Sequence, residues 1–171
     1  MRPTKEETCL KTALLWAERG TCARRKVGCV LVNSLGHVLA TGYNGVAKSL
    51  SHCTDHPCGG ANLPSGTGLD SCEAIHAEQN ALLQCGDTQK IETCYVTASP
   101  CLHCIKLLMN TGCKQIVFLE EYPGHEKAKA LWQSSRKPKY PYVPWKKYAP
   151  SQQVEMNFAP AHPRKFGNLS W

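Results

Sequence analysis

Two short stretches of the chain combine metal-binding side chains with one that moves protons. The first is His76-Ala77-Glu78, and the second is Pro100-Cys101-Leu102-His103-Cys104. Cys101 and Cys104 are spaced so that both sulfurs share one face at the start of a helix. The positive end of the helix favours thiolates there. With His76 as a third ligand, the pattern predicts a zinc site with an open fourth position, as in catalytic zinc.

Glu78 supplies the acid-base group that such a site needs. Zinc lowers the pKa of a bound water toward 7, and a carboxyl group two residues after His76 can point at the same cavity from a helix entry. We therefore predict that Glu78 shuttles protons. A C-x-x-C pair alone is equally typical of redox or structural sites, and the joint occurrence of both motifs favours the catalytic reading. We expect His103 to be exposed or packed rather than a ligand.

Alternating elements are predicted to position these residues. Apolar periodicity and Gly or Pro boundaries predict helices over residues 5–19, 76–85, 102–111 and 125–134. They predict strands over 27–32, 37–41, 93–98 and 115–119, with a hairpin at 33–36. Helices that alternate with strands indicate a layered α/β domain.

Composition limits the kind of protein. A chain of 171 residues with 42% hydrophobic residues suits one domain, here 1–171. No apolar run is long enough to span a membrane and the first residues do not form a secretory signal, so we expect a cytoplasmic protein. The net charge of +7 favours anionic partners such as nucleotides, or is only a solubilising surface.

Eleven cysteines are an odd number in a chain without signs of secretion, which argues against a disulfide framework and for metal binding. Some of these cysteines need no chemical role. We expect small packed core residues at Cys9, Cys29, Cys85, Cys94 and Cys113.

The C-terminal segment 136–171 is basic and aromatic, and an edge strand is expected near Tyr142-Val143. Its mixture of Lys, Tyr and Trp would also suit stacking on single-stranded nucleic acid. We favour a packing or oligomer surface, and we expect no nucleic-acid partner.

Four stretches resemble the deoxycytidylate (dCMP) deaminases of the cytidine deaminase superfamily. They are R-R-K-V-G-C-V-L-V, T-G-Y-N-G, H-A-E-Q-N-A and A-S-P-C-L-H-C, between Cys22 and Tyr122. The resemblance implies a three-layer cytidine-deaminase-like fold with a mixed five-stranded sheet flanked by helices. It implies zinc-dependent hydrolysis of dCMP to dUMP and ammonia, with hydroxide attack at C4 and Glu78 protonating ring N3. It also implies a homohexamer, activated by dCTP with Mg²⁺ and inhibited by dTTP.

The resemblance assigns roles to individual residues. His76, Cys101 and Cys104 match the zinc ligands, and Glu78 matches the proton shuttle. Substrate contacts are implied at Asn44 and Ala77, with weaker candidates for the 5′-phosphate at Arg24, Lys26 and Tyr122. Nucleotide effectors are implied at Gly42, Tyr43 and Gly45. Arg24 is equally compatible with a solvated surface charge.

The segment 45–75 is rich in Gly, Ser and Pro, and a loop of that length inside a domain needs something to order it. We predict a second, structural zinc held by Cys22, Cys53, Cys58 and Cys72, with His52 or His56 able to replace one cysteine. Free loop thiols are the alternative. Two other functions also fit parts of the pattern, namely a base deaminase acting on RNA or single-stranded DNA and a zinc-stabilised binding module without activity.

Overall fold

A mixed sheet of five strands lies at the centre of the computed structural model, which describes residues 2–134 and 144–149. The strands are β1 (Gly28–Val32), β2 (Val38–Tyr43), β5 (Thr93–Ala98), β6 (Gln115–Glu120) and β7 (Trp145–Lys147). Their order is β2-β1-β5-β6-β7. β1 is antiparallel to β2 and β5, whereas β5, β6 and β7 run parallel. The predicted mixed five-stranded sheet is confirmed.

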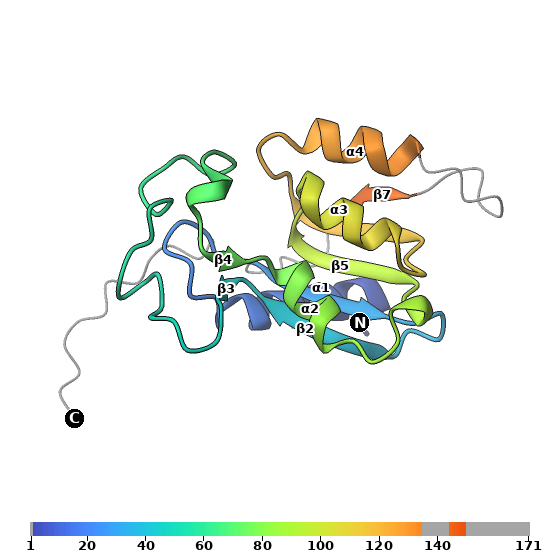
Figure 1. Cartoon of the computed structure of the whole chain (residues 1–171). Helices are drawn as coiled ribbons and strands as arrows, with labels where there is room; N and C mark the ends of the chain where they lie inside the picture. Colours follow the sequence, from blue (N-terminus) through green and yellow to red (C-terminus); the bar gives the residue numbers. More distant parts are fainter. Residues whose placement is uncertain (1, 135–143, 150–171) are drawn as a thin grey trace, which may run out of the picture.

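Helices cover both faces of this sheet, and Figure 1 shows α1 on one side and α2, α3 and α4 on the other. The helices are α1 (Lys5–Ala17), α2 (Ala77–Gln84), α3 (Leu102–Met109) and α4 (His125–Ser134). Side chains of β1 alternate between two cores: Cys29 and Leu31 pack with the α2, α3 and α4 layer, and Val30 packs with α1. Because both faces are covered, β1 is buried along its whole length. The predicted three-layer arrangement is therefore confirmed.

Two glycines allow the helices to approach the sheet closely. A Cβ on Gly28 would lie 1.8 Å from the Ala13 carbonyl oxygen of α1. A Cβ on Gly42 would lie 2.3 Å from the Ala77 carbonyl oxygen and 2.4 Å from the Ala81 nitrogen of α2. Only glycine leaves room for these contacts, so Gly42 fixes the distance between β2 and the start of α2.

The long segment before α2 has structure that its sequence pattern did not reveal. β3 (Gly45–Val46) pairs antiparallel with β4 (Ala74–Ile75), which brings the two ends of the segment together. A 3-10 turn, η1 (Leu69–Ser71), lies inside it, and a second, η2 (Thr88–Lys90), follows α2. In Figure 1 the segment extends, teal to green, away from the central sheet and past the β3–β4 pair.

The predicted element positions hold with small differences. The first helix ends at Ala17 rather than at residue 19. The strand expected near 142–143 lies outside the described residues, as does most of the 136–171 segment, while an edge strand is present at Trp145–Lys147.

No described helix combines the length and apolar character required to cross a bilayer. Four of the cysteines predicted for the core are buried, namely Cys9, Cys29, Cys94 and Cys113, and Cys85 is half-buried.

Candidate metal centre and substrate pocket

Three predicted ligands meet where two helices begin. His76 is the N-cap residue of α2 and Cys101 the N-cap residue of α3, and Cys104 is the third residue of α3. The Nδ1 atom of His76 lies 3.4 Å from the sulfur of Cys101 and 3.4 Å from that of Cys104. The three ligand atoms all lie within 4.8 Å of one another. β4, of the two-stranded sheet, ends directly before His76, and β5, of the central sheet, ends shortly before Cys101, so each helix starts where a strand ends.

The electrostatics of this cluster suit a cation. A hydrogen bond from the Cys104 thiol, assisted by His76, lowers the pKa of Cys101 to about 3. That same hydrogen bond, together with burial, holds the pKa of Cys104 above its usual value. The hydrogen bond with Cys101 raises the pKa of His76. One imidazole nitrogen and two sulfurs that share protons in this way form a donor set that fits zinc, with three protein ligands as in catalytic sites.

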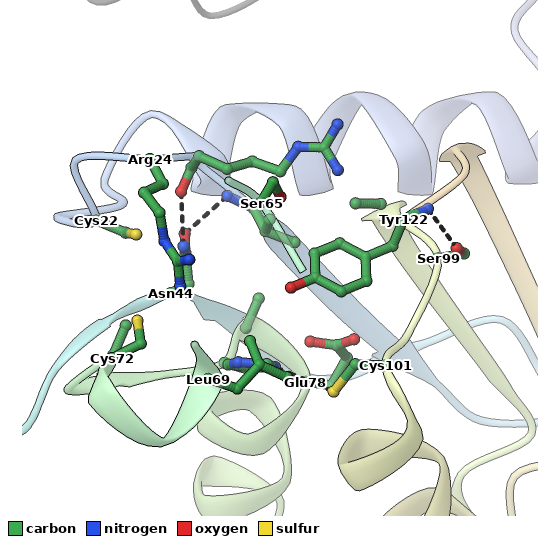
Figure 2. A pocket seen from close by; sticks show the side chains of 16 residues that line it. Cys22, Arg24, Asn44, Ser65, Leu69, Cys72, Glu78, Ser99, Cys101 and Tyr122 are labelled. Carbon is green, nitrogen blue, oxygen red and sulfur yellow. Dashed lines mark hydrogen bonds between the residues drawn. The ribbon is translucent and has the colours of Figure 1, made fainter. Parts of the chain in front are cut away.

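Glu78 is buried beside the three ligands, with only 4% of its surface exposed. Burial raises the pKa of its carboxyl group to about 7, while the nearby His76 opposes that shift. A carboxyl group with a pKa near neutrality both accepts and donates protons readily. Figure 2 shows the Glu78 carboxylate next to the Cys101 sulfur, on one side of the pocket.

A pocket opens over this cluster, and its lining contains most of the predicted substrate residues. Asn44, Ala77, Arg24 and Tyr122 all line it together with His76, Glu78 and Cys101. Lys26 is not among the lining residues. Its Nζ atom donates to the Glu18 carbonyl oxygen at 3.1 Å, at the end of α1. The structure therefore brings all of these predicted contacts together except Lys26.

Hydrogen bonds from two side chains hold the Pro64–Thr67 turn of the long segment beside the pocket. Arg24 Nη1 donates to the carbonyl oxygens of Thr67 at 2.9 Å and of Pro64 at 3.3 Å. The phenol oxygen of Tyr122 accepts from the Gly66 N–H and contacts the Ser65 hydroxyl. The guanidinium of Arg24 is thus used to hold the turn, and Figure 2 shows Ser65 and Tyr122 at the same border of the pocket.

Asn44 connects the pocket to the segment before β1. Its Oδ1 atom accepts from the Val27 N–H at 2.7 Å, and its Nδ2 atom donates to the Arg25 carbonyl oxygen at 2.7 Å. Both bonds are drawn at Asn44 in Figure 2. The amide side chain, 7% exposed, therefore fixes the backbone on both sides of residue 26.

The residues implied as effector contacts lie next to this asparagine. Gly42 packs against α2, as described above. The Tyr43 ring stacks on Trp16, with centroids 6.2 Å apart and planes at 6°, and its carbonyl oxygen accepts from Asn80 Nδ2 at 2.7 Å. Gly45 starts β3. Of the G-Y-N-G stretch, only Asn44 lines the pocket.

The cysteines of the predicted second zinc site lie less close together than the ligands of the first. The sulfurs of Cys53 and Cys58 lie 3.6 Å apart, and Cys58 also forms a hydrogen bond with Cys72. The Thr54 N–H donates to the Thr21 carbonyl oxygen at 3.1 Å, so Cys53 is held near Cys22. Within the described part of the chain, only the first cluster has three ligand atoms all within 4.8 Å of one another. His52 lies 3.8 Å from Asp55 on the exposed surface.

Three pocket residues with polar side chains were not predicted from the sequence. Ser99 accepts from the Tyr122 N–H at 2.8 Å, and its place beside Pro100 in the second motif could have indicated it. Arg25 Nη2 lies 2.9 Å from a carboxylate oxygen of Glu120, and its membership of the R-R-K run was the available signal. Ser65 lies in an aperiodic loop that gave none.

Comparison with known families gives one match, to the cytidine and deoxycytidylate deaminase zinc-binding region, over residues 3–120. The matched range includes both motifs and the long segment between β3 and β4. It ends at the last residue of β6, so it covers the sheet apart from β7.

Curated relatives include several deoxycytidylate deaminases. The protein from Saccharomyces cerevisiae is 36% identical over 130 residues, which are 75% of this chain and 41% of that protein. The one from Mycobacterium phage D29 is 36% identical over 126 residues, 70% of this chain and 98% of the relative. The chain thus spans less than half of the yeast proteins it matches, 41% in one and 45% in the other, and nearly all of the phage protein.

Solved structures show the same arrangement of elements. The dCMP deaminase of cyanophage S-TIM5, in complex with dCMP and dUMP, has 28% sequence identity and a TM-score of 0.63. The similarity covers 85% of this chain and 98% of the phage chain. An apo form of the same phage protein gives a TM-score of 0.61.

Proposed function

We propose that this chain, which belongs to the cytidine and deoxycytidylate deaminase family, hydrolyses dCMP to dUMP and ammonia. The observation that carries the proposal is the buried Glu78 carboxyl group beside the cluster of His76, Cys101 and Cys104. A purely structural metal site has no use for a carboxyl group whose pKa is about 7. The dCMP and dUMP complex of the S-TIM5 enzyme supports the choice of nucleotide.

The chemistry divides between the metal and the carboxyl group. Zinc held by His76, Cys101 and Cys104 would supply Lewis acidity toward a water molecule in its open position. Glu78 accepts a proton from the attacking water on a carboxylate oxygen and delivers it to N3 of the cytosine ring. As the oxygen of that water bonds to C4, Glu78 takes its remaining proton and passes it to the amino group, and the C4–N bond breaks to release ammonia. Burial of Glu78 keeps these protons from exchanging with solvent.

The remainder of the pocket would hold the nucleotide. Asn44 and the Ala77 backbone face the base and sugar in this proposal, and the 5′-phosphate lies toward Arg24, Arg25 and Tyr122. Positive charge from two arginines on the pocket lining favours a dianionic phosphate. Lys26, which donates to the Glu18 carbonyl, contributes only to the charge of this region.

The decisive experiment replaces Glu78 by Gln. We expect Glu78→Gln to reduce ammonia release from dCMP by at least roughly 1,000-fold while the zinc content stays at the wild-type level. Glu126→Gln, at a glutamate that is 75% exposed on α4, is the matched control and should leave the rate unchanged. Loss of zinc from Glu78→Gln, with no turnover by the wild type, would instead support a zinc-stabilised binding module.

Assays with several substrates distinguish a dCMP deaminase from a base deaminase that acts on RNA or single-stranded DNA. Wild-type protein is assayed with dCMP, deoxycytidine, cytosine and a cytosine-containing single-stranded oligonucleotide. Turnover of dCMP in preference to the others is expected. Preference for the oligonucleotide would indicate a base deaminase of RNA or single-stranded DNA, and preference for deoxycytidine would exclude a phosphate-dependent enzyme.

We also propose a structural zinc bound by Cys22, Cys53, Cys58 and Cys72. The 3.6 Å contact between the Cys53 and Cys58 sulfurs and the hydrogen bond that Cys58 accepts from Cys72 support it. Four thiolates close a tetrahedral site and would order the segment around them. Elemental analysis of fully loaded protein should give two zinc ions per chain, and a value of one would exclude the second site.

Allosteric control by nucleotides is a further part of the proposal. Effectors bound at Gly42, Tyr43 and Gly45 would press on α2, because Gly42 contacts Ala77 and Ala81 backbone atoms. That helix carries Glu78 and starts at His76, so a small shift would reach the catalytic groups. We expect dCTP with Mg²⁺ to raise the rate at low dCMP and dTTP to lower it. Identical saturation curves with and without them would exclude regulation.

The same proposal includes a homohexamer in the cytoplasm. Exposed leucines on α2 and α3, Leu83 at 72% and Leu107 at 43%, support an oligomer contact that involves these helices. Eleven free thiols are typical of a reducing compartment. Light scattering during size-exclusion chromatography would measure the assembly, and a mass of one chain would contradict the hexamer.

A further inference from the structure

We infer that Asn80 is a positioning residue for the catalytic carboxyl group, because its side chain ties the start of α2 to the strand that leads into the pocket. Asn80 lies two residues after Glu78 and is half-buried. It belongs to the H-A-E-Q-N-A stretch, in which the resemblance gives roles only to His76, Ala77 and Glu78. The inference rests on the proposed function for the reaction that Glu78 serves.

The tie is a short hydrogen bond between distant parts of the chain. Asn80 Nδ2 donates to the Tyr43 carbonyl oxygen at 2.7 Å. Tyr43 is the last residue of β2, and the next residue, Asn44, lines the pocket together with Glu78. The bond therefore links the helix that carries the proton shuttle to the backbone directly before the pocket asparagine.

Ala77, Asn80 and Ala81 form the face of α2 that lies against β2 (Figure 1), since residues at these spacings share one side of a helix. The backbone of Ala77 and Ala81 packs against Gly42, which fixes how closely the helix approaches. Such a contact between small groups does little to prevent sliding or rotation, whereas a hydrogen bond is directional. Asn80 thus sets the rotation of α2, and with it the direction in which Glu78 projects, about 100° round the helix from Ala77.

The neighbouring amide side chain, that of Gln79, has a different task in the same turn. Its Oε1 atom accepts from the His76 N–H at 2.8 Å, as in a capping box. That bond closes the first turn of α2 on itself and fixes the backbone of a metal ligand. Of these two bonds, only the one from Asn80 reaches β2, so the two side chains should differ in what their loss changes.

This arrangement predicts a loss in kcat rather than in substrate binding. A displacement of about 1 Å in a catalytic group costs up to roughly 100-fold in rate, and α2 without the Asn80 bond is free to turn by such an amount. Asn44 keeps both of its own hydrogen bonds to the loop before β1, so the pocket side of the tie stays in place. The zinc site should also remain, because Gln79 still holds the His76 backbone.

The experiment compares Asn80→Ala with Gln84→Ala, which removes an exposed amide from the last residue of the same helix. The zinc-loaded variants are assayed for kcat and KM with dCMP, for zinc content and for calorimetric binding of dUMP. Asn80→Ala should lower kcat roughly 10- to 100-fold, with KM and dUMP binding changed by less than about 3-fold, and its zinc content should stay at the wild-type level. Asn80→Ser, which keeps a shorter donor, should recover part of kcat, and Gln84→Ala should match the wild type.

A destabilised variant separates positioning from a general loss of stability. Thr111→Val removes a hydroxyl that donates to the Leu108 carbonyl oxygen at 2.7 Å and accepts from the Cys113 N–H at 3.1 Å, and Thr111 is not on the pocket lining. It should lower the urea midpoint, as Asn80→Ala does, yet keep the wild-type kcat. An unchanged kcat in Asn80→Ala, or an equal fall in Thr111→Val, would overturn the inference. So would a loss of zinc from Asn80→Ala that accounts for its lost rate.

Failure of the proposed function gives a separate result. If the wild type deaminates another cytosine compound instead of dCMP, the same comparison of kcat is made with that compound. If it deaminates none, hydrogen exchange of the amides in residues 76–80 decides. Faster exchange in Asn80→Ala than in the wild type and Gln84→Ala would support the tie without the activity, and equal exchange in all three would overturn it.

Discussion

The molecule holds two clusters of sulfur ligands that are built in different ways. His76, Cys101 and Cys104 project from the first turns of α2 and α3, helices that pack on a sheet buried on both faces. Cys53, Cys58 and Cys72 lie in the segment between β3 and β4, where the described structure consists of turns and one 3-10 turn. The first cluster is formed by the fold itself, and the second lies where the fold supplies few constraints.

Because of this difference, we expect substitutions in the two clusters to have different effects. Groups on the sheet and helix layers are held by packing, so a change there alters chemistry or global stability. Groups in the long segment are held by individual hydrogen bonds, such as those from Arg24 to Pro64 and Thr67. A change there should alter local order first. The following variants test this contrast in matched pairs.

The largest effect is expected at the helix cluster itself. Cys104→Ala removes a ligand from α3 and should lower deamination of dCMP by more than roughly 1,000-fold, because catalytic zinc needs all three protein ligands. Zinc content should fall by about one ion per chain while circular dichroism stays close to wild type. Cys85→Ala, at a half-buried cysteine outside both clusters, is the control. Activity above a few per cent in Cys104→Ala would show that this cluster is not the catalytic one.

The next largest effect tests how tightly the sheet and the helices meet. Gly42→Ala places a Cβ 2.3 Å from the Ala77 carbonyl oxygen, so α2 must shift, and we expect a loss of about 2–3 kcal/mol in the free energy of unfolding. Gly59→Ala in the long segment meets nothing closer than 3.5 Å and should change it by less than about 0.5 kcal/mol. Urea unfolding measures both. Equal effects at the two glycines would remove the contrast between a packed and a loosely held region.

The same contrast explains which features were predictable from the sequence. The motif residues and the alternating strands and helices follow local rules of spacing and periodicity, so the zinc ligands, Glu78 and the layer order were predicted. The pairing of β3 with β4 was missed, because two-residue strands give no periodic signal. Arg25 and Ser65 were missed since their roles depend on contacts across the pocket. Lys26 was implied by the resemblance, but its bond to the Glu18 carbonyl depends on where α1 ends.

A third pair compares two threonine hydroxyls. Thr97 Oγ1, on β5, accepts from the Gly28 N–H at 3.2 Å and is buried. Thr97→Val keeps the shape but leaves that buried N–H without its partner, at a cost of about 1–2 kcal/mol. Thr67 Oγ1 donates to the Pro64 carbonyl at 2.7 Å on the exposed turn, where water replaces the lost bond, so Thr67→Val should cost less than about 0.5 kcal/mol. A larger loss in Thr67→Val would mean that the turn contributes to global stability.

A change in the second cluster should affect global stability less than a change in the packed layers. Cys58→Ala removes a half-buried thiol that contacts Cys53 and Cys72, and it should lower the unfolding free energy by less than about 1 kcal/mol because the packed layers remain intact. Order in the segment should suffer more: limited proteolysis between residues 47 and 73 should accelerate at least several-fold, and one zinc ion per chain should be lost. Since Cys22, Cys72 and Arg24 all line the pocket, KM for dCMP should also rise.

Cys85→Ala again serves as the control, and its proteolysis rate should match the wild type. Suppose instead that Cys58→Ala lowers the stability of the whole chain, so that the long segment unfolds together with the sheet and helices. The segment would then be part of the packed structure, and the two clusters would differ in chemistry but not in how they are held.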